Sequence, residues 1–232
     1  MIPLYDHNPT HRPPVLTIAI IAINVLVYFG WQMRVGLEQS VALGAFIPVE
    51  LSTRIPGAPT HVLTSMFMHG GLMHLVGNMW FLWIFGDNVE NATGHVRFLS
   101  FYLLTGVLAT LTYTWLQPAS EVPLVGASGA ISGVLGGYLV KHPMVPVRTL
   151  IPLGLFTRII DLPAFVFLFI WIGMQIFSEL ARDASRGGGG VAYMAHIGGF
   201  IAGVILIFVF ENPKLEEEQA RGRRRRIESP WD

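Results

Sequence analysis

The sequence predicts an all-α membrane protein with six transmembrane helices, and three observations lead to this fold class. Of the 232 residues, 52% are hydrophobic and only 13% are charged, and the mean hydropathy is +0.53. A chain of this composition is too apolar for an ordinary soluble domain. Six apolar segments alternate with polar, Gly-rich or Pro-containing connections. We therefore expect one compact membrane domain.

Charge and cysteine content exclude several classes of function. The 15 Lys and Arg residues balance 15 Asp and Glu residues, so nothing indicates a nucleic-acid partner. The chain has no Cys, which excludes disulfides, thiolate chemistry and cysteine-based metal sites.

The first part of the chain contains a tail, one span and a long connection. Residues 1–14 are polar and Pro-rich and lack the pattern of a signal peptide, so we expect a cytoplasmic tail. Residues 15–33 are long enough to span the membrane, and Asn24 within them is expected to form an interhelical hydrogen bond. Residues 34–60 are too apolar to be fully solvated, and we expect a partly helical segment in the membrane interface.

Five further apolar segments complete the membrane domain, which we place at residues 15–210. Charged residues, Pro or Gly bound each segment, and the fourth span of the six is unusually short. The predicted spans are 72–85, 98–116, 127–141, 162–177 and 191–210. Residues 211–232 are expected to form a charged cytoplasmic tail.

The distribution of Lys and Arg predicts the orientation. Eleven of the 15 basic residues lie in the two tails and in the second and fourth connections, and four lie on the other side. The positive-inside rule therefore places both termini in the cytoplasm.

Polar side chains on three of the predicted spans share one depth. Ser128, His74 and His196 precede the charged inner end of their spans by 13 to 15 residues, which is roughly 20 Å of helix. In a hydrocarbon core about 30 Å thick, they lie about 10 Å below the outer surface. Asn78 is one turn from His74 on the same helical face. Polar groups at this depth are expensive to leave unpaired, which favours a shared site over separate interhelical hydrogen bonds.

The residue types at this level match nucleophilic catalysis. A serine hydroxyl is a weak nucleophile until a base takes its proton, and His196 is the only imidazole in the sixth span at the level of Ser128. No Asp or Glu lies within the predicted spans, so no carboxylate completes a triad and a two-aspartate protease is excluded. His69 and His74 lack metal-ligand spacing and a carboxylate partner, so we expect no metal and no cofactor.

Stripes of small residues explain how Ser128 and His196 could meet. Such stripes allow two helix backbones to approach closely. They consist of Gly129, Gly133 and Gly137 on the fourth span and of Gly199 and Gly203 on the sixth. Ser128 also opens its helix, where free N–H groups can stabilise an oxyanion. His74 and Asn78 can add side-chain donors.

Three sequence motifs, in their order along the chain, resemble those of the rhomboid family of intramembrane serine proteases. They are His74–Asn78, Gly126–Gly129 and Ala195–Gly203. The resemblance implies a Ser128 nucleophile, a His196 base and an oxyanion site formed by the Ser128 backbone with His74 and Asn78. It also implies cleavage of transmembrane protein substrates, in or near their membrane segment, within a lipid bilayer. His69 matches the family as well, in a structural role.

The chain departs from the family pattern at two places. Many members have a Trp-Arg pair ahead of the second span, where this chain has Thr60 and His61. Many also carry an aromatic residue one turn after the serine, where this chain has Ser132.

Two other functional classes stay open on the sequence. A catalytically inactive rhomboid-like module would bind membrane proteins without cutting them, although both Ser128 and His196 are present. A small transporter or channel would be expected to show inverted repeats or paired broken helices, and we find none. No targeting extension is recognised, so we expect a bacterial-type plasma membrane.

Overall fold

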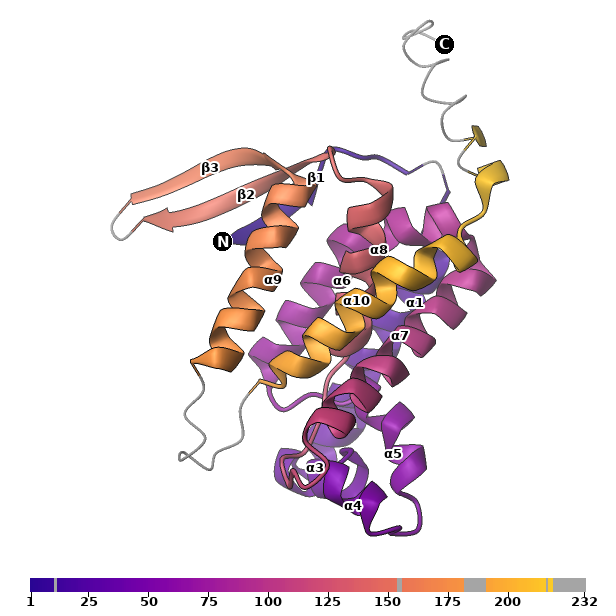
Figure 1. The fold of residues 1–232 in the computed structure, drawn as a ribbon, viewed down its shortest axis with the longest axis vertical. Helices are drawn as coiled ribbons and strands as arrows, with labels where there is room; N and C mark the ends of the chain where they lie inside the picture. The colour runs from indigo at the N-terminus through magenta and orange to yellow at the C-terminus, as the bar shows by residue number, and fades with distance from the viewer. Residues whose placement is uncertain (11, 154–155, 182–190, 216, 219–232) are drawn as a thin grey trace, which may run out of the picture.

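The structure is a computed structural model, which describes residues 1–10, 12–153, 156–181, 191–215 and 217–218. Most of these residues are helical, and the long helices form one bundle (Figure 1). The helices are α1 (Val15–Val27), α2 (Met33–Val35), α3 (Leu37–Gly44), α4 (Pro48–Ser52), α5 (Ala58–Thr64), α6 (Leu72–Thr93), α7 (His95–Leu116), α8 (Ser128–Lys141), α9 (Ala164–Leu180) and α10 (Tyr193–Phe210). A π-helical turn (Tyr28–Gln32) joins α1 to α2, and a 3₁₀ turn (Ser65–Phe67) follows α5. The strands are β1 (Ile2–Asp6), β2 (Pro146–Leu153) and β3 (Phe156–Pro163).

Helix α8 is the centre of the bundle. It packs against α6, α7, α9 and α10, and every residue from Ala130 to Tyr138 is buried. A helix surrounded by protein does not have to match the bilayer with its own apolar length, which explains why this segment is short.

Among the described residues, three segments are long and apolar enough to cross a bilayer by length and composition. They are Val15–Val35, His95–Leu116 and Tyr193–Phe210, and α9 is a shorter apolar helix. The membrane character of the chain is therefore clear, whereas the count of six transmembrane helices stays a prediction.

Helix α6 continues to Thr93, beyond the predicted end of this span at residue 85. The physical reason is that the charged residues in its last turns have partners. The buried Glu90 carboxylate accepts hydrogen bonds from the backbone N–H groups of Leu16, at 2.9 Å, and Thr17, at 2.7 Å. It thereby caps the positive N-terminal end of α1.

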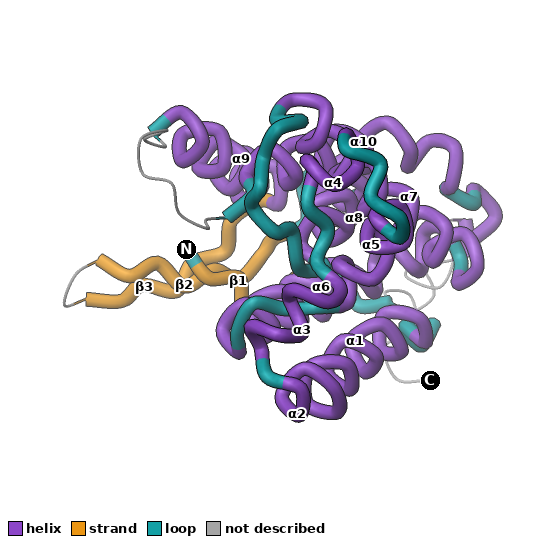
Figure 2. The backbone as a smooth tube through the Cα atoms, turned by 90° about the horizontal axis from the view of Figure 1, so that it is seen from below, coloured by secondary structure: helices purple, strands orange, loops and turns teal. Residues whose placement is uncertain are grey.

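A three-stranded antiparallel sheet contradicts the all-α prediction. Its order is β1-β2-β3, with Ile2 opposite Leu150 and Pro146 opposite Pro163. The strands occupy the predicted N-terminal tail and the predicted irregular connection between the fourth and fifth spans. The sheet extends sideways from the bundle next to α9 (Figures 1 and 2).

A polar cluster fastens β1 to the ends of α6 and α8. Tyr138 Oη donates to Asp6 Oδ2 at 2.5 Å, and Asn88 Nδ2 donates to the same oxygen at 2.9 Å. The buried Asn8 amide also donates to Asn88 Oδ1. The N-terminal segment is therefore part of the folded domain and not a loose tail.

We expect the stability of this cluster to depend on pH. Burial raises the pKa of the Asp6 carboxyl, outweighing the lowering effect of the Tyr138 hydrogen bond. A carboxyl whose pKa is higher in the folded state stabilises the fold below its unfolded pKa, and this contribution is lost as pH rises through the folded pKa. Asp6→Asn keeps an acceptor oxygen without titrating, so its Tm minus that of the wild type should be larger at about pH 8 than at about pH 4. Thermal unfolding in detergent measures this, and an equal difference at both pH values would contradict it.

The connection before α6 is helical in part, as predicted, and is anchored by Gln32. Gln32 Oε1 accepts from the His69 backbone N–H at 2.9 Å, and Gln32 Nε2 donates to the His69 carbonyl at 3.1 Å. These two hydrogen bonds anchor the connection at His69. The place where many family members have a Trp-Arg pair, Thr60 and His61 in this chain, is a different one. The prediction for Asn24 is wrong, because its Nδ2 donates to Ile20 O within α1 at 2.8 Å.

The predicted glycine contact between α8 and α10 is confirmed. A Cβ atom added at Gly199 would lie 2.1 Å from Gly129 O, and one added at Gly203 would lie 1.9 Å from Gly133 O. Both neighbours are backbone atoms, so no side-chain rotation could relieve either contact.

Gly199→Ala is expected to separate α8 from α10 and to cost both stability and activity. The neighbouring carbonyl would have to move by more than an ångström to reach ordinary contact. A displacement of about 1 Å in a catalytic site can cost roughly a hundredfold in rate. The matched control is Gly173→Ala on α9, because a Cβ there meets no atom of the described residues within 4 Å. Tm and turnover of both variants test this, and a Gly199→Ala protein equal to the control would contradict it.

Candidate active site

Ser128 is the first residue of α8 and follows a sharp backbone turn. Gly126 has φ +120°, in the region that favours glycine, and its N–H donates to Ser65 O at 2.9 Å. A Cβ at Gly126 would lie 2.7 Å from the His74 ring. The N-cap residue of α8 is Ala127, whose methyl group cannot hydrogen-bond to the start of the helix, and the first N–H groups of a helix have no intrahelical partner.

The structure brings Ser128 and His196 together across the α8–α10 contact. Ser128 Oγ lies 2.8 Å from His196 Nε2, within hydrogen-bond range. Gly129 directly follows Ser128 and Gly199 is three residues after His196, and the contact between these glycines allows the two backbones to lie this close. The predicted meeting of the two side chains is confirmed, and their catalytic roles stay a prediction.

Residues of α9 and the first residue of α10 contact the other sides of the His196 ring. Its Nδ1 lies 2.8 Å from Gln175 Oε1, and its ring centre lies 6.2 Å from that of Trp171 at an angle of 31°. Tyr193 contacts the ring edge-on at 6.4 Å. These aromatic rings take the place of an aromatic residue at Ser132. Sequence reasoning missed Gln175, although a lone amide inside an apolar span is itself a signal of a buried polar contact.

His74 and Asn78 lie beside Ser128, as their spacing predicts. All three line a pocket of about 210 Å³ that Trp171 also borders. The Nδ2 atom of Asn78 is buried, lies near Gly126 and has no hydrogen-bond partner among the described residues. An unpaired buried donor next to a serine is available for an acceptor that arrives with a substrate.

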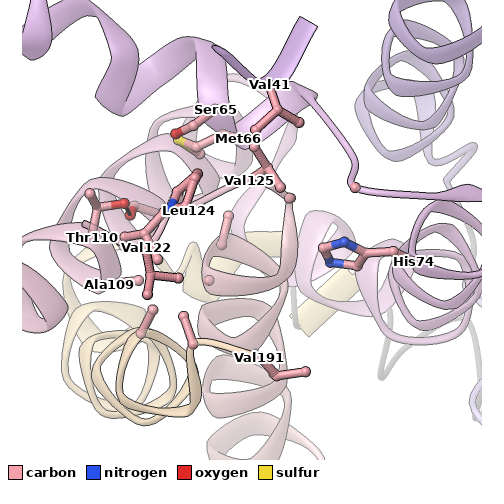
Figure 3. A pocket seen from close by; sticks show the side chains of 18 of the residues that line it. Val41, Ser65, Met66, His74, Ala109, Thr110, Val122, Leu124, Val125 and Val191 are labelled. Atoms are coloured by element: carbon pink, nitrogen blue, oxygen red, sulfur yellow. Dashed lines mark hydrogen bonds between the residues drawn. The ribbon is translucent and has the colours of Figure 1, made fainter. Parts of the chain in front are cut away.

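A larger, mostly apolar pocket lies on the other side of His74. Its volume is about 830 Å³, and it is bordered by α6, α7, α8, α10 and the segment that ends at Gly126. His74 lies on one side of this pocket, and Ala109 and Thr110 lie on the opposite side (Figure 3). Met73 and His74 line both pockets, so the larger pocket lies next to the Ser128 site.

Comparisons with known proteins identify the family. Residues 56–212, more than half of the chain, match the Rhomboid domain. The chain is 30% identical over 201 residues to "Rhomboid protease GluP" of Bacillus subtilis, covering 87% of this chain and 36% of that protein. It is 33% identical over 190 residues to the human "Presenilin-associated rhomboid-like protein, mitochondrial", covering 80% and 45%. It is 27% identical over 231 residues to "Rhomboid protein 1, mitochondrial" of Saccharomyces cerevisiae, covering 95% and 60%.

The matches extend over nearly all of this chain, although it spans only about a third to three fifths of the length of these relatives. The domain match covers all three motifs found in the sequence, from His74 to Gly203. The chain therefore belongs to the rhomboid family.

Proposed function

We propose that this protein is an intramembrane serine endopeptidase that cleaves transmembrane protein substrates in or near their membrane segment. The observation that carries the proposal is the 2.8 Å contact between Ser128 Oγ and His196 Nε2 beside an apolar pocket. The relative named as a protease supports the same activity.

The proposed reaction is acyl transfer in two halves. His196 Nε2 takes the Ser128 proton while Oγ attacks the scissile carbonyl carbon, and the carbonyl oxygen becomes an oxyanion. N–H groups at the start of α8, with His74 and Asn78, donate to that oxyanion. The imidazolium then protonates the leaving amine, and the acyl-enzyme is hydrolysed by a water that His196 deprotonates in turn.

The proposed setting is a bilayer crossed by six helices, α1 with α2, α6, α7, α8, α9 and α10. The C-terminal ends of α8 and α10 meet through a hydrogen bond from Lys141 to Glu211. Because Lys and Arg are in excess in the two tails and in the second and fourth connections, we propose that both termini lie on this face of the membrane. The relatives include one bacterial and several mitochondrial proteins. We therefore propose no particular membrane and do not retain the prediction of a bacterial plasma membrane.

A fluorophosphonate probe separates this proposal from the inactive binding module. The probe is expected to label the purified wild-type protein in detergent and not Ser128→Ala, and only the wild type should cleave a model transmembrane substrate. Substrate binding by the wild type without labelling or cleavage would support the inactive module instead.

A further inference from the structure

We infer that Gln175 of α9 is a positioning residue that holds His196 in the tautomer and orientation needed to take the Ser128 proton. This inference rests on the proposed protease function. It adds a third member to the Ser128 and His196 pair and makes α9 part of the catalytic arrangement.

The first argument is the tautomer of His196. A neutral imidazole has one N–H group, and its other nitrogen is an acceptor. Nε2 must be the acceptor to take a proton from Ser128, which lies 2.8 Å away, so the ring proton belongs on Nδ1. Nδ1 lies 2.8 Å from Gln175 Oε1, an oxygen that can only accept. This contact therefore favours the tautomer that the reaction needs.

A second contact favours the same orientation of the Gln175 amide. Its Nε2 donates to Trp171 O, one turn earlier in α9, through a long hydrogen bond of 3.5 Å. The reversed amide would place one oxygen against another at Trp171. It would also offer an N–H group to Nδ1 and favour the wrong tautomer of His196. Both contacts thus select the same arrangement.

Gln175 and Trp171 act from one face of α9, because residues four apart lie one above the other on a helix. The Trp171 ring lies beside the imidazole at a tilt of 31°, and Gln175 Oε1 contacts the imidazole Nδ1. An amide provides this acceptor without the cost of burying a carboxylate among apolar helices. The orientation of the base therefore depends on how α9 packs against α10.

The acceptor for the Nδ1 proton of His196 is Gln175 and not a neighbouring carboxylate. Among the residues that the structure describes, the titratable groups that interact with the imidazole are His74 of α6, through its charge, and Tyr193 of α10, through its ring. Glu179 follows Gln175 by one turn, and its Oε1 accepts from Gln117 Nε2 at 3.3 Å. Within the described parts of the chain, no carboxylate is recorded as a partner of His196 Nδ1.

Two substitutions of Gln175 test the inference. Gln175→Leu is expected to lower kcat about tenfold to a hundredfold, the effect of one lost hydrogen bond, with KM little changed. Gln175→Glu restores an acceptor and adds a negative charge that favours the imidazolium. Its kcat above the acid limb should exceed that of the Leu variant, and the acid limb of its pH–rate profile should move up by about one pH unit.

A matched control is Asn24→Leu, which removes a buried amide whose hydrogen bond stays within α1. This variant is expected to keep the wild-type kcat and pH profile. If Gln175 only packs between helices, Gln175→Leu should also keep the wild-type kcat and pH profile. The acid limb of the pH–rate profile of Gln175→Glu should then stay at its wild-type position. Either outcome would overturn the inference, and the Glu profile decides it even where the Leu variant folds poorly.

Nitrogen-15 NMR of the imidazole in detergent provides a readout that does not depend on activity. His196 should be an Nδ1–H tautomer in the wild type and a mixture in Gln175→Leu. An Nε2–H tautomer in the wild type would overturn the inference. A wild-type protein that shows the Nδ1–H tautomer without labelling or cleavage would instead count against the proposed protease function alone.

Discussion

Ser128→Ala and His196→Ala are each expected to reduce cleavage of a model transmembrane substrate by roughly 10⁴- to 10⁶-fold. The two side chains form one hydrogen-bonded unit, in which the hydroxyl needs the imidazole to remove its proton. The double variant should therefore be about as slow as either single variant. Initial rates of the three purified proteins, normalised to folded protein, measure both effects.

The control for this prediction is Ser100→Ala on α7, whose hydroxyl bonds to Val96 O on an exposed face. It should cleave like the wild type. Ser128→Ala and Ser100→Ala should show Tm values close to that of the wild-type protein, because each loses only one hydroxyl group. Substantial turnover by a folded His196→Ala protein would refute the assignment of the base.

Much of the helical fold could be predicted because its signals are local. Apolar runs gave the starts of α1, α6, α8 and α10 to within two residues. The sheet could not be predicted in this way, because β1 pairs with a strand about 145 residues away. The C-terminal end of α6 was also missed, since Glu90 is acceptable in a buried helix only because α1 supplies its donors.

The candidate site could be predicted to the extent that depth and spacing determine it. Ser128, His74 and Asn78 line one pocket. Ser128 and His74 lie at the same depth on the adjacent helices α8 and α6, and Asn78 follows His74 by one helical turn. Gln175 could not be predicted in this way, because its partner His196 is 21 residues away on another helix. An amide side chain by itself also does not indicate a catalytic role. Its role depends on the rotation of α9, which no local pattern specifies.

Asn78→Ala is expected to lower kcat by about 10² to 10³, roughly 3 to 4 kcal/mol, the usual cost of one oxyanion donor. Ser128, His196 and the backbone N–H groups of α8 remain in this variant, so the loss should be partial. Because the donor is needed as negative charge develops during attack, KM should change little. Labelling by the fluorophosphonate probe should be slowed and not eliminated.

The structure makes this test sharper, because in the part of the chain that it describes Asn78 Nδ2 has no hydrogen-bond partner, although the residue is only 9% exposed. Removing an unpaired donor breaks no hydrogen bond, so the Tm of Asn78→Ala should stay near that of the wild type. A role in tying helices together predicts instead a lower Tm and a raised KM.

Asn78→Asp adds a second arm of nearly the same shape. It replaces the donor with a group that repels an oxyanion when ionised, so at neutral pH it should be slower than Asn78→Ala. Turnover, KM and Tm measured on the same preparations decide between the two roles. A destabilised Asn78→Ala protein with wild-type turnover per folded molecule, or an Asp variant faster than the Ala variant, would rule out oxyanion stabilisation by this side chain.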